Sequence, residues 1–402
     1  MRIKPLRDYE GYVILVAPLL NSVSGIAIDL FAPSMPAIAR ELHVSGAVMQ
    51  SSISVTLVAY AVGQLVFGLI ADGRGRLAAL LPGLVLFIAG SLVAMFAQDI
   101  TVFLIGRALQ GFSVGACQVS ARALLVDNVK GERFFVAVVY LSLAWGLGPV
   151  IAPFAGGLVQ EYAGWRWNFS LYAIYSAILL VMSLRLRESL ARDRRKSLSQ
   201  SLRGYRLILG DTQFLAATLA LGASLSLFLI WNIIGPFIVQ RVLHLSAAFF
   251  GATALAAGMS YLVGTFLSRA LIKKMPPRNL MLSGLVASAV GLAVLISTPG
   301  DLNLVTLILG VILSNFGQGL LFSNVVAFTM KLYADRAGAT ASLLGCGMMI
   351  VASLSSAGTG QIAISSNLVV GLLFAILIVL QTLGVLHVLR RVTSLEVKHE
   401  SR

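Results

Sequence analysis

Long stretches without a single Asp, Glu, Lys or Arg are the feature that most restricts how this chain can fold. Each is at least about 18 residues long, which is enough for an α-helix to cross the hydrocarbon core of a bilayer. The composition agrees, because 58% of the residues are hydrophobic and only 11% are charged, too few to cover a water-soluble fold. The stretches cover residues 42–71, 77–98, 134–160, 167–184, 212–240, 242–268, 279–300, 302–330 and 337–389.

These stretches predict twelve membrane-spanning helices. The last one, 337–389, is long enough for two crossings and has a turn signal at residues 365–367. Two further helices come from the apolar segment 11–39 and from the segment around Arg107. A closed barrel is excluded, since its strands are shorter and alternate in polarity. We therefore predict an all-α polytopic membrane protein.

The net charge of +14 indicates topology rather than nucleic-acid binding. If both termini face the cytoplasm, Lys and Arg gather in cytoplasmic segments, as the positive-inside rule requires, and contact with anionic lipid is a secondary role. The exceptions are Arg40, Arg107, Arg166 and Arg241. No cleavable signal peptide is expected, because the first apolar segment is too long for one and continues as a spanning helix.

Comparison of the chain with itself at an offset of 201 residues, half of its length, indicates a duplication. Arg40, His43 and Ser45 recur as Arg241, His244 and Ser246. Gly63, Gly83 and Gly90 recur as Gly264, Gly284 and Gly291. We predict two six-helix bundles, 1–187 and 211–402, related by a pseudo-two-fold axis along the membrane normal, with a substrate site between them. A basic cytoplasmic linker, 188–210, joins the bundles.

Asp29 and Arg107 are charges within apolar segments of the first half, and the repeat places aliphatic residues at both equivalent positions. Counted from Arg40 and Asp99 at about 1.5 Å per residue, they lie roughly 16 and 12 Å deep, so they can meet. An intramembrane carboxylate indicates a proton or ion pathway. We expect Asp29 to alternate between a proton and a competing interaction that Arg107 biases. The alternatives are a purely structural ion pair and an Arg107 that snorkels to the outer surface.

The short connection between the second and third helices carries Gly68, Asp72, Arg74, Gly75 and Arg76. Glycine there permits close helix approach and a tight turn, and the carboxylate can pair with a base or cap a helix. The pattern resembles the cytoplasmic signature loop of the major facilitator superfamily. That family has a basic residue directly after the aspartate, whereas this chain has glycine there. One of the basic groups that make ionic contacts in the family's loop is therefore missing.

Two further motifs support the resemblance. Arg107, Gln110, Gly111 and Gly115 in the fourth helix resemble the family's second motif, and the two glycines form a G-x-x-x-G face. The fifth helix resembles the signature of the superfamily's exporters through Gly148, Pro149, Ala152, Pro153, Gly156 and Gly157. We expect this small-residue face to slide against a matching stripe on the eighth helix, which consists of Ala252, Ala256, Ser260, Gly264 and Ser268. The alternative is tight packing without motion.

Asp29 with the Pro33-x-x-Pro36 pattern narrows the resemblance to the bicyclomycin and chloramphenicol resistance group of twelve-helix drug:proton antiporters. This resemblance implies an exporter of small amphipathic drugs that works by alternating access, with the proton gradient as its energy source and no bound cofactor. It also implies a monomer in the bacterial cytoplasmic (inner) membrane, in contact with protons and membrane lipids. The alternative is an exporter or importer of one endogenous metabolite, such as a siderophore or an amino-acid derivative.

Polar residues on helices that face a central cavity are the candidates for substrate binding. Apart from Asp29 and Arg107 no fixed charge is expected there, so neutral amphipathic compounds are favoured. Each candidate is alternatively a contact between helices. The candidates are Asp29, Tyr60, Gln64, Trp145, Trp231, Asn232, Asn315 and Gln318.

Other function classes are excluded by motifs that the sequence lacks. No G-x-x-x-x-G-K-[ST] loop for an ATP-driven pump occurs. No paired carboxylates, H-E-x-x-H or Ser/His constellation occurs in the apolar stretches, so an enzyme is not expected. Cys117 and Cys346 lie within apolar helices, so neither a disulfide nor a metal site is expected.

Overall fold

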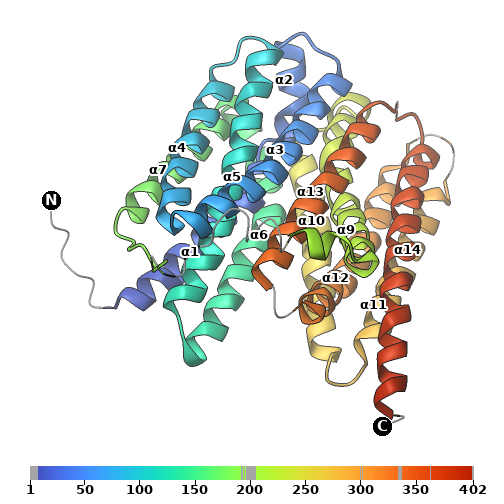
Figure 1. The fold of residues 1–402 in the computed structure, drawn as a ribbon. Helices are drawn as coiled ribbons and strands as arrows, with labels where there is room; N and C mark the ends of the chain where they lie inside the picture. The colour runs from blue at the N-terminus through green and yellow to red at the C-terminus, as the bar shows by residue number, and fades with distance from the viewer. Residues whose placement is uncertain are drawn as a thin grey trace. The chain divides into compact units, whose positions relative to one another are not determined.

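The apolar stretches form helices, and several of these begin at polar capping residues. Asp99 Oδ1 accepts a hydrogen bond from Val102 N at 2.9 Å, and Asp211 Oδ1 accepts one from Gln213 N at 2.8 Å. Each cap satisfies a donor that the first helical turn leaves free. The computed structural model describes residues 8–191, 193, 195, 205–298, 300, 302–333, 337–362 and 364–400. All regular structure in this part of the chain is helical (Figure 1).

The helices follow the predicted order of membrane crossings. Eleven of the helical segments in the described residues are long and apolar enough to cross a membrane. The remaining predicted crossing, α7, has 19 residues and begins with a polar turn at residues 165–168. The predicted all-α membrane fold is confirmed. The helices are α1 (Tyr9–Asp29), η1 (Ala32–Ser34), α2 (Met35–Glu41), α3 (Gly46–Gly73), α4 (Arg76–Met95), α5 (Ile100–Asn128), α6 (Gly131–Tyr162), α7 (Trp165–Ser183), α9 (Thr212–Phe237), η3 (Ile238–Val242), α10 (Ala247–Leu271), α11 (Pro277–Ile296), α12 (Leu304–Leu332), α13 (Ala337–Gly360) and α14 (Asn367–Glu400).

The chain divides into two compact units. Unit 1 consists of Met1–Leu202 and Val239–Ala252, and unit 2 consists of Arg203–Ile238 and Thr253–Arg402. The division after Leu202 falls within the predicted linker 188–210, of which residues 192, 194 and 196–204 lie outside the described part. The inclusion of Val239–Ala252 in unit 1 differs from the predicted bundle boundary.

Side-chain hydrogen bonds explain why the segment after α9 clusters with unit 1. Gln240 Nε2 donates to the main-chain oxygen of Pro33 at 2.8 Å, and Arg241 Nη2 donates to that of Pro36 at 3.3 Å. The two acceptors lie in η1 and α2 of unit 1. The segment is therefore hydrogen-bonded to the outer end of the first predicted membrane crossing.

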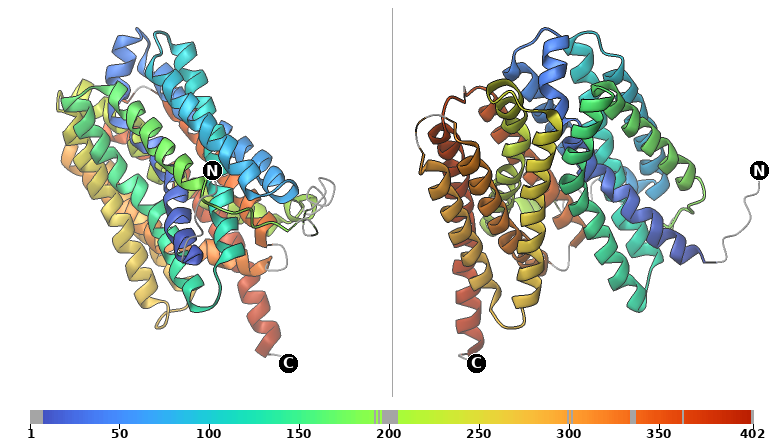
Figure 2. Two further views of the ribbon diagram at one scale, coloured as in Figure 1. Left: turned by 90° about the vertical axis from the view of Figure 1, so that its left-hand side faces the viewer. Right: turned by 180° about the vertical axis from the view of Figure 1, so that it is seen from behind.

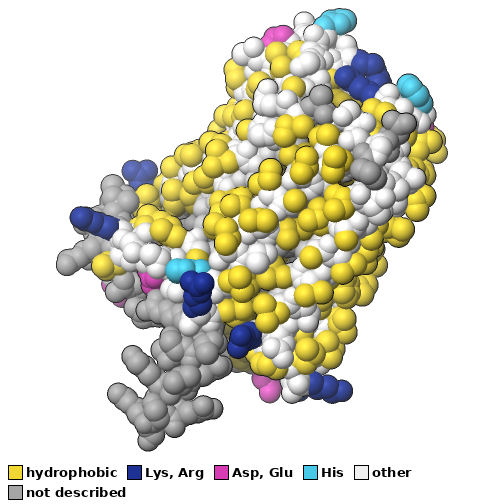
Figure 3. Space-filling model, turned by 90° about the vertical axis from the view of Figure 1, so that its right-hand side faces the viewer, with side chains coloured by type: hydrophobic (Ala, Val, Ile, Leu, Met, Phe, Trp, Pro, Cys, Tyr) yellow, Lys and Arg dark blue, Asp and Glu magenta, His cyan; other side chains and the backbone are white. Residues whose placement is uncertain are grey.

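Within each unit the helices pack side by side. In unit 1, α1 contacts α5 and α6, while α4 contacts α5 and α7. In unit 2, α9 contacts α12, α13 and α14, and α11 lies beside α12 and α14. Figure 2 shows the same neighbours from two further sides. On the face drawn in Figure 3, hydrophobic side chains spread over the middle and Lys and Arg lie at the margins, as expected of a surface in contact with lipid.

The predicted duplication is visible in the backbone as well as in the sequence. His43 has φ 52° and His244 has φ 53°, and these are the only non-glycine residues with positive φ in the described part of the chain. Ser45 then accepts a hydrogen bond from Val48 N, and Ser246 accepts one from Phe249 N. The two halves therefore turn from their first into their second long helix in the same way.

Glycines that match across the repeat make the same close helix contacts. A Cβ atom built at Gly63 would overlap the main-chain oxygen of Phe112, and one built at Gly264 would overlap that of Phe316. In the same two helix pairs, Gly115 faces Gly63 in unit 1 and Gly319 faces Gly264 in unit 2. The backbones of α3 and α5, and of α10 and α12, approach each other only because these positions lack a side chain.

The first predicted crossing is not one continuous helix. The segment 11–39 was expected to span the membrane as a single helix, but α1 ends at Asp29. Pro33 and Pro36 stand at the starts of η1 and α2, where a missing N–H is tolerated. Because proline has no donor for a continuing helix, the two prolines break the crossing directly after its only acidic residue.

Candidate functional site

Asp29 and Arg107 lie close together in unit 1. Asp29 is the last residue of α1 and is 2% exposed, and Arg107 on α5 is 0% exposed. The charge of Asp29 acts on Arg107, so the two lie within range of electrostatic interaction. This agrees with the similar depths counted from the sequence. A carboxylate and a guanidinium thus face one buried environment at a helix end.

Arg107 is held in place by groups on two helices. Its Nη1 donates to Gln110 Oε1 at 2.6 Å, and its Nη2 donates to the main-chain oxygen of Ala27 at 3.1 Å. Its guanidinium carbon lies 4.0 Å from the centroid of the Phe31 ring, as in a cation–π contact. The alternative that Arg107 snorkels to the outer surface is wrong, because its side chain is fully buried.

The broken end of α1 supplies acceptors for this cluster. The last turn of a helix leaves main-chain oxygens without partners inside the helix. Tyr172 Oη on α7 approaches one of them, Ala27 O, at 3.2 Å, and also Ile26 O at 3.1 Å, which accepts from Leu30 N as well. Arg107 approaches Ala27 O from α5. Two donors from different helices therefore stabilise the turn that carries Asp29.

Gln110 extends the hydrogen bonds of Arg107 into a neighbouring helix. Gln110 Nε2 donates to Ser91 Oγ on α4 at 2.8 Å, and Ser91 Oγ in turn donates to Phe87 O at 2.7 Å. Gln110 and Tyr172 were not identified from the sequence as partners of Arg107. Gln110 belongs to the fourth-helix motif, but the motif alone does not show that it binds Arg107. Tyr172 lies far along the chain, and no local pattern connects it to α1.

A second polar cluster in unit 1 contains Tyr60 and Gln64, two predicted substrate residues on α3. Tyr60 is 1% exposed and its hydroxyl has no hydrogen-bond partner of good geometry, although Ser24 and Gln64 lie beside it. Gln64 Nε2 donates to Gln118 Oε1 on α5, while Gln64 Oε1 is buried without a partner. Two buried polar atoms of this cluster therefore lack a well-formed hydrogen bond within the protein.

The predicted substrate residues of unit 2 have different surroundings. Gln318 is held by three helices, because it accepts from Ser224 Oγ at 2.5 Å, donates to Ser288 Oγ at 3.0 Å and exchanges hydrogen bonds with Gln381. Asn315 is buried and its Oδ1 has no partner. Gln318 thus joins helices within unit 2, whereas Asn315 retains a free acceptor.

The remaining candidates are aromatic or amide residues on α6 and α9. Trp231 is buried and its Nε1 donates to Thr253 Oγ1 at 3.1 Å. Asn232 is also buried, and Trp145 on α6 is half-buried. No group of three or more His, Cys, Asp or Glu able to hold a metal occurs among the described residues.

The signature loop forms an ion-pair cluster around Arg76. Arg76 Nη1 lies 2.7 Å from Asp72 Oδ1, and Arg76 Nε lies 3.0 Å from Asp127 Oδ2 at the end of α5. Ser189 Oγ also donates to Asp127 Oδ2 at 2.7 Å. Arg74, the other predicted base of the loop, is exposed. Although the loop has glycine directly after Asp72, it is joined to a different helix by the ion pair between Arg76 and Asp127.

Glu188 closes the same loop from outside the membrane-spanning segments. Its carboxylate accepts from Arg76 N at 2.9 Å and from Leu77 N at 3.0 Å, so it caps the start of α4. Burial alone would raise the pKa of Glu188, but main-chain donors from Leu190, Arg76, Leu77 and Ser189 lower it below its ordinary value. The sequence alone did not identify Glu188, because its partners are main-chain groups 112 residues earlier in the chain.

Gly75 is the residue that lets this loop turn. It has φ 126°, a conformation that side chains disfavour. A Cβ atom at this position would also overlap the carboxylate of Glu188. The prediction that Gly75 permits a tight turn is therefore confirmed, and the same position admits the cap of α4.

The fifth-helix motif packs α6 tightly against α1. A Cβ at Gly25 would lie 2.7 Å from Trp145 O, one at Gly148 would lie 2.9 Å from the Gly25 carbonyl carbon, and one at Gly156 would overlap Leu30 O. Pro149 and Pro153 lie inside α6, which continues from Gly131 to Tyr162. The small residues of this motif thus bring α6 against the broken end of α1, one residue after Asp29.

The later positions of the matching stripe on α10 pack against α12. Ser260 Oγ donates to Ile312 O at 2.8 Å, and Ser268 Oγ donates to Leu320 O at 3.2 Å, both on α12. Gly264 also packs against α12. The start of α10 packs against the fifth-helix motif, because a Cβ at Gly157 would lie 2.6 Å from Ala247 O and one at Gly251 would lie 2.8 Å from Pro153 O. Sliding of the two stripes stays a prediction.

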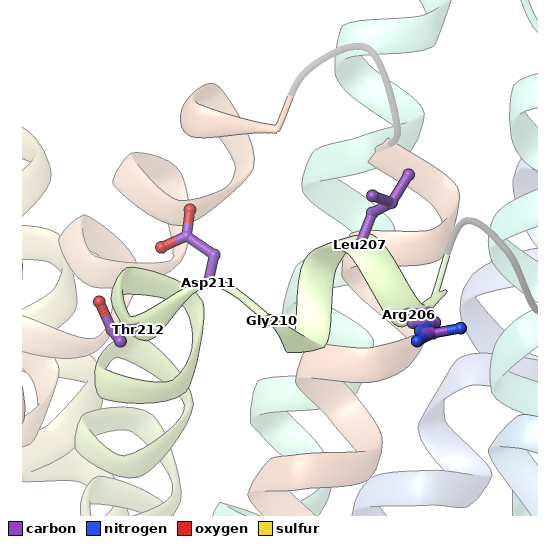
Figure 4. A pocket seen from close by; sticks show the side chains of 5 residues that line it. All are labelled: Arg206, Leu207, Gly210, Asp211 and Thr212. Carbon is purple, nitrogen blue, oxygen red and sulfur yellow. The ribbon is translucent and has the colours of Figure 1, made fainter.

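A shallow hollow lies at the start of α9 (Figure 4). Its Asp211 caps α9 and accepts a hydrogen bond from Tyr333 Oη at 2.5 Å. The carboxylate is therefore engaged in holding the fold. The hollow is lined by Arg206, Leu207, Gly210, Asp211 and Thr212.

Comparison with known proteins identifies what this arrangement resembles. The family model of the Major Facilitator Superfamily matches residues 19–356. The multidrug resistance protein MdtL of Escherichia coli O157:H7 is 29% identical over 361 residues, which cover 88% of this chain and 89% of the relative. The uncharacterized MFS-type transporter YdgK of Bacillus subtilis (strain 168) is 27% identical over 344 residues, which cover 84% and 86%.

Solved structures share the fold at low sequence identity. A D-xylose–proton symporter superimposes with a TM-score of 0.73 at 16% identity, covering 95% of this chain and 97% of the other. The peptide transporter POT in complex with sulfate superimposes with a TM-score of 0.72 at 15% identity, covering 96% and 94%. At these identities the likeness establishes the fold, while the chemistry must be argued from the residues.

Proposed function

Because this chain belongs to the major facilitator superfamily, we propose that it is a proton-coupled antiporter that exports small amphipathic compounds. It is a multi-pass membrane transporter rather than an enzyme. The observation that carries the proposal is the position of Asp29, buried at the broken end of α1 and within the electrostatic range of Arg107. Such a carboxylate can change its protonation state when its surroundings change.

Opposing influences make Asp29 suitable as a proton carrier. Burial disfavours the carboxylate, and the C-terminal end of a helix carries partial negative charge that disfavours it further. The positive charge of Arg107 favours the carboxylate. Because Arg107 is bound to Gln110 on its own helix and to Ala27 O on α1, a shift of the end of α1 would alter the contact with Ala27 and change the balance at Asp29. Proton release and uptake can thus follow a conformational change.

Export from the cytoplasm is the direction we propose, with the protein in the bacterial inner membrane and both termini in the cytoplasm. The distribution of Lys and Arg supports this orientation. The fifth-helix motif resembles that of exporters, and the MdtL relatives are named multidrug resistance proteins. Tyr60, Gln64 and Asn315 are the proposed substrate contacts with free buried polar atoms. We propose that the transporter works as a monomer driven by the proton gradient.

Transport into inverted proteoliposomes tests this function. The purified chain is reconstituted, a pH gradient is imposed with the lumen acidic, and accumulation of a panel of neutral and cationic amphipathic compounds is followed. Gradient-dependent accumulation of several compounds is the expected result. Accumulation that is insensitive to a protonophore would contradict proton coupling. Accumulation of one compound alone would favour an exporter of a single metabolite.

A further inference from the structure

Arg122 is a second cation within α5, distinct from Arg107. It lies 15 residues further along the helix, or roughly 22 Å, and about 9 Å before the helix ends at Asn128. Its side chain is exposed in unit 1. No carboxylate in the described part of the chain forms an ion pair with Arg122, and the group on which its charge acts is Tyr60. An exposed cation within a membrane-spanning helix marks a water-accessible position at which an anionic group can bind.

The groups beside Arg122 are polar and incompletely satisfied. Gln118 lies one helical turn earlier on α5 and holds the amide of Gln64. Tyr60 Oη and Gln64 Oε1 are both buried and neither has a hydrogen-bond partner of good geometry, although Ser24 and Gln64 lie beside the hydroxyl. Leaving a buried donor or acceptor unpaired typically costs about 1–3 kcal/mol. One exposed cation, one hydroxyl and one amide oxygen, the last two without a well-formed hydrogen bond, therefore lie along the α3–α5 pair.

We propose that Arg122 and Tyr60 bind the carboxylate of an amphipathic organic acid. The guanidinium and the hydroxyl donate to the carboxylate oxygens, and Gln64 Oε1 accepts from an N–H or O–H group next to the acid. This assignment rests on the proposed function as a transporter and names a substrate class for it. It replaces the expectation that neutral amphipathic compounds are favoured, which counted Asp29 and Arg107 as the only fixed charges.

Equilibrium binding of a matched acid and amide tests the site. Dansylglycine and dansylglycinamide differ only in the carboxylate, and both fluoresce more strongly in an apolar site. The full chain is placed in nanodiscs of phosphatidylcholine without any pH gradient. The acid is expected to bind at least about tenfold more tightly than the amide, because hydrogen bonds to a charged group are strong. Equal binding of the two probes, or no binding of the acid at 1 mM, would overturn the proposal.

Substitutions assign the preference to named residues. In Arg122→Gln the preference for the acid should fall below about twofold while amide binding changes less than twofold, which also reports that the variant is folded. Arg122→Lys should retain part of the preference, and Tyr60→Phe should reduce it about two- to threefold. Arg269→Gln removes an exposed arginine from unit 2 and should change nothing. A preference for the acid that survives Arg122→Gln would overturn the assignment.

Anionic lipid is the other source of a negative group at this depth. Nanodiscs that contain phosphatidylglycerol distinguish it, because a lipid phosphate that occupies the site would remove the Arg122-dependent part of the preference. That result would also overturn the proposal, whereas an unchanged Arg122-dependent difference supports it. Binding is measured without a gradient, so failure of this site and failure of proton coupling are separate results.

Discussion

Arg107 Nη2 donates a 3.1 Å hydrogen bond to the main-chain oxygen of Ala27, two residues before Asp29. The contact places a fixed positive charge at the end of the helix that carries Asp29, the only acidic residue between Gly11 and Ala39. It also uses an oxygen that is free because α1 stops there. The break in the helix, the carboxylate and the guanidinium are therefore parts of one arrangement.

Arg107→Lys tests whether the shape of the guanidinium matters in addition to its charge. Lysine keeps the positive charge but cannot donate to Gln110 and Ala27 in the same fixed geometry. We expect gradient-driven transport to fall at least about tenfold, with a smaller loss than in Arg107→Met. The measurement is the initial rate in proteoliposomes, normalised to the amount of protein that is reconstituted. Equal rates in Arg107→Lys and the parent would show that charge alone suffices.

Gly156→Ala tests the close approach of α6 to α1. The added methyl group would overlap Leu30 O, and overpacking of this kind typically destabilises by about 1–3 kcal/mol. The melting temperature of the purified protein in detergent should therefore fall. Gly358→Ala is the matched control, because a Cβ there meets nothing within 4 Å. That variant should be neutral or slightly stabilised. An unchanged melting temperature in Gly156→Ala would mean that the two helices are not in contact.

Asp127→Asn and Asp72→Asn distinguish the two partners of Arg76. Asp127 is 22% exposed and also accepts from Ser189, whereas Asp72 is 40% exposed. Because solvent weakens an exposed pair, Asp127→Asn should lower stability by about 1–2 kcal/mol and Asp72→Asn by less than about 1 kcal/mol. Chemical unfolding of both variants provides the comparison. A larger effect at Asp72 would contradict this ranking.

Glu188→Gln tests the cap of α4 through its pH dependence. The folded-state pKa of Glu188 lies below its ordinary value of 4.5, so the carboxylate contributes stability above that value and loses it as the pH falls through the folded-state pKa. The variant should therefore melt at a lower temperature than the parent at pH 7. The difference should shrink as the pH is lowered below about 4.5. A difference that is constant with pH would exclude titration of Glu188 as its cause.

The sequence predicted the fold and the two central charges for identifiable physical reasons. Charge-free stretches of bilayer length define the helices, and a lone acid or base within such a stretch is conspicuous. Gly75 was found because a tight turn requires glycine. The repeat predicts equivalent turns at His43 and His244, and both residues have a positive φ in the structure.

Tertiary contacts account for what the sequence left open. Tyr172 meets Ala27 across 145 residues, and Glu188 meets Arg76 across 112, so no local spacing reveals either contact. The end of α1 at Asp29 was missed because hydropathy continues through the prolines. Arg122 was counted with the cytoplasmic bases, since neither its exposure nor the free hydroxyl of Tyr60 can be read from composition.

Asp29→Asn, studied by two assays in one set of proteoliposomes, tests the central claim that Asp29 carries the coupled proton. Substrate exchange at equal pH on both sides needs no net proton transfer, whereas accumulation under an imposed pH gradient does. We expect the variant to retain exchange within about threefold of the parent rate and to lose accumulation altogether. Accumulation that still depends fully on the pH gradient in Asp29→Asn would contradict the account.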